Sequence, residues 1–205
     1  MFTGIVEELG FFKTQNPAGL HIGAKLVLES LKVGDSIAVN GVCLTVTRFD
    51  RSSFHADIMP ETLRLSNLGK LPFNSPLNLE RAITLNGRMG GHLVQGHIDG
   101  TARLVSSVPE GNAHVLTFET DKNLTRYMVH KGFVAVNGVS LTITALQETR
   151  FSVSLVALSR KSTNLGLIKT GDTVNIETDI IGKYVEKLFR PERGISPEFL
   201  AENGF

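Results

Sequence analysis

Ala38-Val39-Asn40-Gly41-Val42-Cys43-Leu44-Thr45-Val46-Thr47 returns 97 residues later as Ala135-Val136-Asn137-Gly138-Val139-Ser140-Leu141-Thr142-Ile143-Thr144. Asn-Gly between alternating apolar residues is a strong hairpin signal. Both central residues of a type I′ turn need positive φ, and these two residue types adopt it at little cost. Each copy is therefore predicted to form a β-hairpin.

The same offset relates further pairs of residues without a gap. Phe54 corresponds to Phe151, and the Asn-Leu-Gly at 67–69 corresponds to that at 164–166; Asn78 and Glu80 correspond to Asn175 and Glu177. Matches in constant register indicate an internal duplication. We expect two tandem domains, residues 1–90 and 91–180, followed by a C-terminal helix and tail at 181–205.

Side chains alternate between the two faces of the strand that follows each Asn-Gly. Val42, Leu44 and Val46 form the core face in the first copy. The other face presents Cys43, Thr45 and Thr47 in the first copy and Ser140, Thr142 and Thr144 in the second. Two interpretations remain open: a polar row that hydrogen-bonds a flat ligand, or the ordinary preference of threonine for strands with a small buried cysteine.

Composition narrows the class of protein. The chain has 205 residues and a formal net charge of +1, so no electrostatic footprint for nucleic acid or membrane is expected. An oligonucleotide-binding barrel is disfavoured further because the chain has no Trp and two Tyr for stacking bases. One cysteine excludes an intramolecular disulfide and fits a reducing compartment. Since no signal peptide or membrane span is evident, we expect a cytoplasmic protein.

Short period-two segments broken by Gly, Asp, Asn and Pro predict a small barrel or sandwich in each half. Strands are expected at Gly4–Glu8, Ser36–Val39, Val42–Phe49, Phe54–Ile58 and Leu77–Arg81. Short helices are expected at Ala24–Leu31, Glu61–Leu65, Asn123–Val129 and around Arg160, with a final turn at Ser196–Leu200.

An amphipathic helix is predicted after the repeat ends. Ile181, Tyr184, Val185, Leu188 and Phe189 recur at spacings of three and four. A helix of about nine residues is too short to be stable alone, so its apolar stripe must dock. It could pack on the chain's own barrels or on copies of itself in an oligomer.

The histidines lack the spacing of a metal site, and no metal is expected. A hydrolase pair of Cys43 with His97 lacks the glycine-rich nucleophile contexts of known hydrolases. Aligning Gly4 with Gly96 places His97 at the position of Ile5. Because the twin position is aliphatic, the fold does not require an imidazole there, and His97 is a candidate proton-transfer residue.

The motifs together resemble the riboflavin synthases of the trimeric alpha type over nearly the whole chain. They are the N-terminal Met-Phe-Thr-Gly-Ile-Val, both Asn-Gly hairpins, Glu61-Thr62-Leu63, Asn67-Leu68-Gly69, and Gly90-Gly91-His92-Leu93 with Gly96-His97-Ile98. The resemblance implies an all-β fold: two tandem six-stranded Greek-key barrels related by duplication, plus a C-terminal α-helix that joins three subunits.

The implied activity is that of a transferase in riboflavin biosynthesis. Two molecules of 6,7-dimethyl-8-ribityllumazine exchange a four-carbon unit to give riboflavin and 5-amino-6-ribitylamino-uracil, without metal or redox cofactor. The resemblance also implies a homotrimer, with each active site between the N-barrel of one subunit and the C-barrel of the next, and an association with lumazine synthase. The alternative is a non-catalytic lumazine- or flavin-binding protein of the antenna type.

The resemblance carries over to individual residues. His97 and Ser140 would handle protons, and Cys43 would lie near the exchanging carbons. The N-barrel pocket would hold Gly4, Ile5, Val6, Cys43, Leu44, Thr45, Asp57, Ile58, Met59, Pro60, Glu61 and Thr62. The C-barrel pocket would hold Gly96, His97, Ile98, Lys131, Ser140, Leu141, Thr142, Ser154, Leu155, Val156, Ala157, Leu158 and Ser159.

Overall fold

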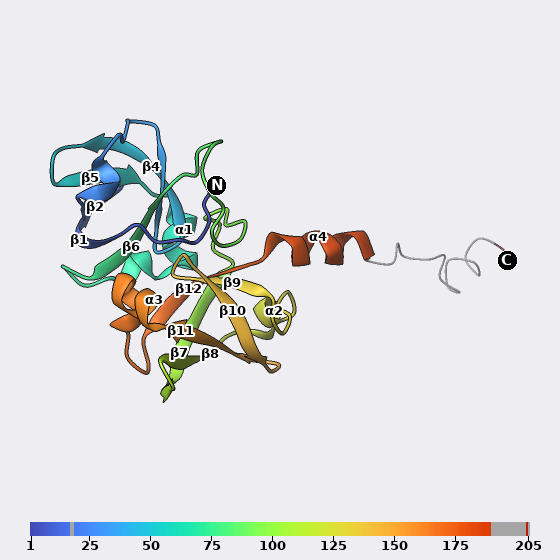
Figure 1. Cartoon of the computed structure of the whole chain (residues 1–205). Helices are drawn as coiled ribbons and strands as arrows, with labels where there is room; N and C mark the ends of the chain where they lie inside the picture. The colour runs from blue at the N-terminus through green and yellow to red at the C-terminus, as the bar shows by residue number, and fades with distance from the viewer. Residues whose placement is uncertain (17–18, 190–203, 205) are drawn as a thin grey trace.

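Two closed β-barrels make up the body of the protein (Figure 1). The computed structural model describes residues 1–16, 19–189 and 204. The N-barrel consists of β1 (Glu8–Asn16), β2 (Gly19–Gly23), β3 (Ser36–Val39), β4 (Val42–Phe49), β5 (Ser53–Asp57) and β6 (Pro76–Arg81). The C-barrel consists of β7 (Gly100–Glu110), β8 (Ala113–Glu119), β9 (Phe133–Val136), β10 (Val139–Leu146), β11 (Arg150–Val156) and β12 (Thr173–Thr178).

Both barrels have the same antiparallel topology. The N-barrel closes in the order β1-β2-β5-β4-β3-β6, and the C-barrel repeats this order with β7 in the place of β1. Strands β2 and β5 are neighbours although β3 and β4 lie between them in sequence, which is a Greek-key connection. The predicted all-β fold with two six-stranded barrels is confirmed.

The two Asn-Gly turns form as predicted. Asn40 and Gly41 have φ of 46° and 80°, and Asn137 and Gly138 have 46° and 77°. Val39 pairs with Val42, and Val136 with Val139, so each loop has the two residues of a tight hairpin.

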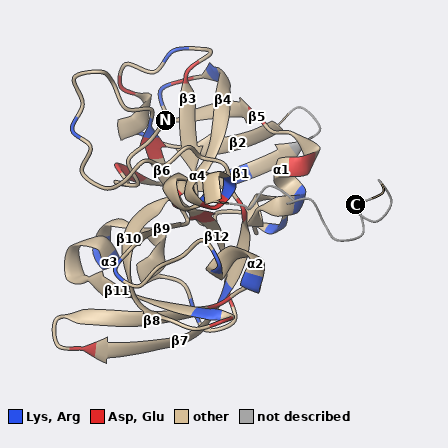
Figure 2. Cartoon of the chain, turned by 90° about the vertical axis from the view of Figure 1, so that its right-hand side faces the viewer, with Lys and Arg blue, Asp and Glu red and all other residues tan. Residues whose placement is uncertain are grey.

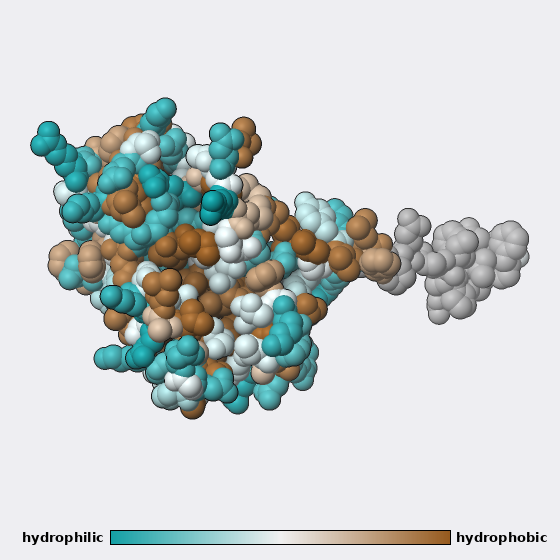
Figure 3. All heavy atoms as spheres, in the orientation of Figure 1, coloured by the Kyte–Doolittle hydropathy of each residue, from teal (hydrophilic) through white to brown (hydrophobic). Residues whose placement is uncertain are grey.

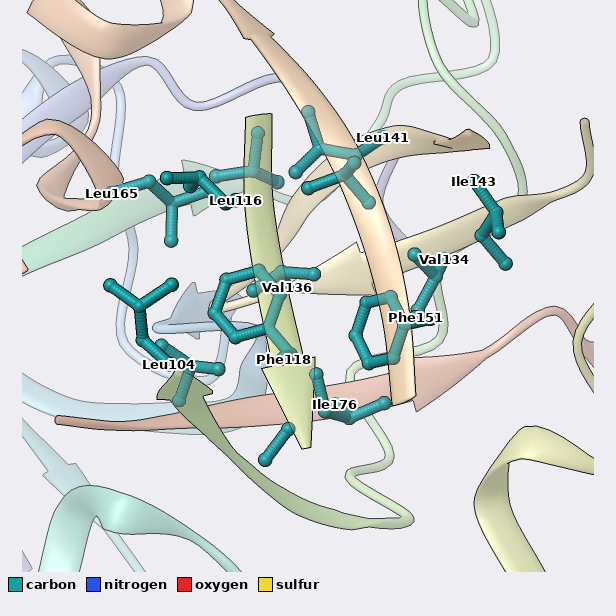
Figure 4. Close-up of a cluster of buried hydrophobic side chains, with 14 of the residues drawn as sticks. Leu104, Leu116, Phe118, Val134, Val136, Leu141, Ile143, Phe151, Leu165 and Ile176 are labelled. Atoms are coloured by element: carbon teal, nitrogen blue, oxygen red, sulfur yellow. The ribbon is translucent and has the colours of Figure 1, made fainter. Parts of the chain in front are cut away.

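Each barrel encloses its own apolar core. In the C-barrel, Phe118 and Phe151 lie with ring centroids 5.4 Å apart and are surrounded by aliphatic side chains from most of the strands (Figure 4). Phe54 is the equivalent of Phe151 in the N-barrel and is fully buried. Val42, Leu44 and Val46 point into the N-barrel core, as the alternation predicts.

Short helices close the barrel ends: the 3₁₀ turns η1 (Leu26–Leu28), η2 (Asn67–Lys70) and η3 (Asn164–Gly166), and the helices α1 (Pro60–Leu65), α2 (Lys122–Thr125) and α3 (Ala157–Ser162). The predicted helix at Ala24–Leu31 is wrong beyond the single turn η1. Ser30 has φ of +65°, which a right-handed helix does not allow. The predicted turn at Ser196–Leu200 lies outside the described residues.

The predicted strand at Gly4–Glu8 is also wrong, because β1 starts only at Glu8. Gly4 has φ of +77°, outside the β region, and its N–H bonds the Glu80 carboxylate instead of a neighbouring strand. The residues before Glu8 therefore form a connecting segment. The sequence pattern also missed most of β1 and all of β2.

Helix α4 (Ile180–Phe189) projects from the junction of the barrels (Figure 1). Its polar side is anchored to the C-barrel half: Lys183 Nζ lies 2.5 Å from Asp99 Oδ1, and Glu186 pairs with Arg126. Its apolar side chains stay exposed and form part of the apolar surface visible along the helix in Figure 3: Ile181, Tyr184, Val185, Leu188 and Phe189. Docking of this stripe on the chain's own barrels is therefore contradicted.

Charged residues of both signs are interspersed over both barrels (Figure 2). Among the described residues, no helix is long and apolar enough to cross a membrane.

Candidate functional site

A cleft opens on the outer side of the β4 hairpin strand in the N-barrel. It has a volume of about 560 Å³ and is called the N-cleft below. Cys43 is a free thiol of intermediate exposure, and Thr45 is exposed. The lining comes from β4, the end of β5 and α1: Cys43, Leu44, Thr45, Asp57, Ile58, Met59, Pro60 and Thr62.

The C-barrel presents an equivalent surface 97 residues later, called the C-face below. It comprises Ser140, Leu141 and Thr142 on β10 and the run Ser154–Ser159 at the junction of β11 and α3. Val156, Ala157 and Leu158 are exposed there, while Leu155 lies in the barrel core. The core side chains Leu44, Leu141 and Leu155 can therefore offer a ligand mainly their backbone.

The connecting segments before the two barrels cross over to the opposite barrel. Cys43 N–H donates to the carbonyl of Gly96 at 2.9 Å, and Ser140 N–H donates to the carbonyl of Gly4 at 2.8 Å. The two segments pair with each other midway, since Phe2 N–H bonds Val94 O at 2.7 Å. Each half thus places the segment that precedes its barrel against the barrel of the other half.

This crossover corrects the predicted grouping of site residues. Gly4, Ile5 and Val6 were expected beside Cys43, but Gly4 contacts Ser140 and Val6 packs against the C-barrel core. Gly96, His97 and Ile98 were expected beside Ser140, but Gly96 contacts Cys43 and Ile98 packs against the N-barrel core. Strand periodicity tells which face a side chain takes but not which barrel a connecting segment reaches.

The alignment of Gly4 with Gly96 is confirmed by their geometry. Both have positive φ, +77° and +84°. A Cβ on Gly4 would lie 2.6 Å from Ser140 Cβ, and one on Gly96 would lie 2.4 Å from Cys43 Cβ. Neither position has room for a side chain, so both must be glycine.

Ser140 Oγ lies 2.7 Å from Nδ1 of His92, a residue that sequence reasoning did not include in the site. The His92 ring is buried and stacks on Phe133 with centroids 5.2 Å apart. Burial lowers the pKa of His92, so the neutral ring is favoured, and Ser140 can donate its hydroxyl proton to Nδ1. The sequence signal that could have pointed to His92 is the Gly90-Gly91 before it. Gly91 packs closely on Ser140, since a Cβ on Gly91 would lie 2.9 Å from Ser140 Oγ.

The predicted pairing of His97 with Ser140 is therefore not formed within one chain. The His97 side chain is exposed, and its backbone N–H donates to Glu177 Oε2 at 3.0 Å. His97 directly follows Gly96, whose carbonyl accepts from Cys43 N–H, but His97 is not among the residues that line the N-cleft.

Two further predicted residues lie on the surface. Glu61 on α1 pairs with Arg64 and does not line the N-cleft. Lys131 is exposed in the turn before β9 with φ of +66°, and its N–H bonds Ile143 O.

Six asparagines form a hydrogen-bonded network at the barrel junction. Asn78 Nδ2 donates to Asn137 O at 2.8 Å, and Asn175 Nδ2 donates to Asn40 O at 2.9 Å, so each bond crosses between barrels. Asn67 N–H donates to Asn175 Oδ1, and Asn164 N–H donates to Asn78 Oδ1, both at 2.7 Å. Equivalent residues of the two halves make equivalent bonds in this network. The network therefore fixes the position of the N-cleft relative to the C-face.

Groups of three or more His, Cys, Asp or Glu that could hold a metal ion are absent from the described part of the chain. A larger cavity of about 660 Å³ lies between the N-terminal segment and the connector at 82–88, and of the predicted residues only Ile5 lines it. The candidate site therefore comprises the N-cleft and the C-face.

Residues 3–82 and 95–179 each match the model of the lumazine binding domain. The chain is 45% identical to the riboflavin synthase of Actinobacillus pleuropneumoniae and 43% identical to that of Bacillus subtilis (strain 168), covering all of each chain in both cases. Among solved structures, it resembles LumP complexed with riboflavin, with a TM-score of 0.78 and 26% identity over 87% of this chain and 99% of that chain.

Proposed function

We propose that this chain, which belongs to the riboflavin synthase family of lumazine-binding proteins, converts two molecules of 6,7-dimethyl-8-ribityllumazine into riboflavin and 5-amino-6-ribitylamino-uracil. One lumazine occupies the N-cleft and the other the C-face. The observation that supports the proposal is the paired geometry: β4 and β10 occupy equivalent positions in the two barrels, and each contacts a glycine from the other half.

A reaction between two identical molecules requires two similar pockets that act differently, one on a donor and one on an acceptor of the four-carbon unit. Duplication supplies the similarity. The difference lies in the thiol of Cys43 against the hydroxyl of Ser140, and in His97 against Ile5.

Holding both reactants in register supplies most of the rate enhancement. Positioning two molecules can lower the activation barrier by roughly 7–11 kcal/mol. General acid–base catalysis raises the rate about 10²–10⁴-fold, which corresponds to about 3–5 kcal/mol. A site of backbone groups, hydroxyls, one thiol and imidazoles suits this requirement, because the C7 methyl group of the lumazine is already an activated carbon acid.

The proposed assembly is a homotrimer in which the N-cleft of one subunit faces the C-face of its neighbour. This arrangement would bring His97 of one subunit toward Ser140 of the next, and Lys131 to the rim. The exposed apolar stripe of α4 supports the assembly, because no other described part of the chain covers it and a second subunit could bury it. An association with lumazine synthase and a cytoplasmic location stay predictions from the sequence.

The test is a turnover assay: purified protein with the lumazine in buffer containing chelator and no nucleotide. The expected result is the colour and fluorescence of riboflavin in amounts above the enzyme concentration. The alternative is a non-catalytic lumazine- or flavin-binding protein, and the likeness to LumP, solved with the lumazine and with riboflavin, supports binding of both ligands. Binding of the lumazine without riboflavin formation would favour that alternative.

A further inference from the structure

Two buried carboxylates hold the crossing segments, and neither belongs to the predicted site. Glu177 on β12 is 3% exposed, and Glu80 on β6, its equivalent in the repeat, is 6% exposed. Burying a carboxylate is costly unless hydrogen bonds compensate, so each must have strong partners.

Glu177 accepts three consecutive backbone N–H groups. Gln95 N–H donates to Oε1 at 2.6 Å, and Gly96 and His97 N–H groups donate to Oε2 at 2.8 and 3.0 Å. The carboxylate therefore fixes the backbone orientation of the segment that contacts Cys43 in the opposite barrel.

Glu80 repeats the arrangement in the other half. It accepts the N–H and hydroxyl of Thr3 at 2.7 and 2.8 Å and the N–H of Gly4 at 3.1 Å. Gly4 in turn accepts from Ser140 in the opposite barrel at 2.8 Å.

We infer that Glu177 and Glu80 are positioning residues for the proposed reaction, each acting on the ligand surface of the barrel that it does not belong to. Glu177 sets the place of Gly96, His97 and Cys43 at the N-cleft. Glu80 sets the place of Gly4 and Ser140 at the C-face. That these two surfaces bind the reacting lumazines rests on the proposed function.

The hydrogen-bonding capacity of the carboxylate explains why an acid stands at both positions. Above the pKa of about 7 to which burial raises Glu177, its side chain is a carboxylate that accepts at both oxygens and satisfies all three donors. An amide would instead turn an NH₂ group toward one of them. Substitution by glutamine keeps the shape and volume but leaves at least one buried N–H facing a donor, which loosens the segment.

The internal symmetry offers a matched pair of variants, Glu177→Gln and Glu80→Gln. Cys43 is the only cysteine of the chain, so its alkylation rate by iodoacetamide reports on the N-cleft without any turnover. At about pH 8.5, where Glu177 is ionised, we expect Glu177→Gln to raise this rate about five-fold or more, the factor that corresponds to one net hydrogen bond. Glu80→Gln is expected to leave the rate at the wild-type value, although Glu80 belongs to the same barrel as Cys43.

The second measurement separates kcat from lumazine affinity. Both variants should lose about ten-fold in kcat and less in affinity, because misplaced reactants bind but rarely align. If wild-type protein shows no turnover, the proposed function fails, while the alkylation comparison still tests the crossed positioning. Equal alkylation rates in the two variants, or a larger effect of Glu80→Gln, would overturn the inference.

A further pair of variants tests the same crossed contacts from the glycine side. Gly96→Ala and Gly4→Ala carry similar strain, because both glycines have positive φ and meet a Cβ of the opposite barrel. Only Gly96→Ala is expected to change Cys43 alkylation. The same change in Gly4→Ala would contradict the inference.

Discussion

His92 and Ser140 form a hydrogen bond of 2.7 Å between Nδ1 and Oγ, although 48 residues separate them in the chain. The bond joins the connecting segment of the second half to the hairpin strand of the C-barrel. It gives the Ser140 hydroxyl one defined partner and leaves its remaining capacity for a ligand.

This bond predicts that the effects of His92→Phe and Ser140→Ala on the free energy of unfolding are not additive. Phenylalanine keeps the stacking on Phe133 but removes the acceptor of the hydroxyl proton. In a double-mutant cycle followed by urea unfolding, we expect a coupling of about 1 kcal/mol. Additive effects would show that the contact contributes nothing to stability.

Glu177 predicts a pH dependence of stability. Burial raises its pKa to about 7, against the effect of the three N–H donors. The folded state then binds more protons than the unfolded state between pH 4.5 and 7, so this contribution is full below 4.5 and is lost as the pH rises through 7.

The variant Glu177→Gln lacks this titration. Its free energy of unfolding, minus that of the wild type, should therefore increase between pH 5 and 8, by on the order of 3 kcal/mol. Urea unfolding at closely spaced pH values measures the difference. A difference that is independent of pH would refute the raised pKa.

His97→Ala is expected to slow turnover far more than it weakens lumazine binding, because His97 follows Gly96, which contacts Cys43, and an imidazole is a common general acid–base group. Steady-state kinetics and fluorescence titration separate the two quantities. His21→Ala is the control, since His21 stacks on His55 and belongs to no proposed site. Equal losses of kcat and affinity would assign His97 to binding alone.

Removal of the chain after Gly182 deletes the exposed apolar stripe of α4 except Ile181, together with the anchors Lys183 and Glu186. We expect monomers with low activity, as measured by light scattering and turnover. The milder variant Leu188→Glu with Phe189→Glu keeps both anchors and should have the same effect. Trimers in either variant would rule out the proposed role of the helix.

The asparagine network predicts that equivalent substitutions in the two halves lower the free energy of unfolding by equal amounts. Asn175→Ala removes the donor to Asn40 O and the acceptor of Asn67 N–H, and Asn78→Ala removes the equivalent bonds. Each should lower the free energy of unfolding by about 1–3 kcal/mol, since buried partners lose their bonds. A cost near zero for one of them, measured by urea unfolding, would show that the halves are not equivalent there.

Local sequence patterns predicted the structure correctly where a few neighbouring residues determine the conformation. The two Asn-Gly turns, the core face of Val42, Leu44 and Val46, and α1 opened by Pro60 all formed as expected. The helix at Ala24–Leu31 failed because apolar spacing did not reveal the positive φ of Ser30.

The sequence by itself revealed the duplication through matches in constant register. It also determined that each half is a small barrel or sandwich with an Asn-Gly hairpin, and that Cys43 and Ser140 occupy equivalent strand positions. Such features follow from turn chemistry and strand alternation, which act over a few residues. Only the tertiary structure decided that Gly96 meets Cys43, that Gly4 meets Ser140, and that His92 rather than His97 bonds Ser140 within the chain. These contacts depend on how two folded barrels pack against each other, and no local periodicity encodes that arrangement.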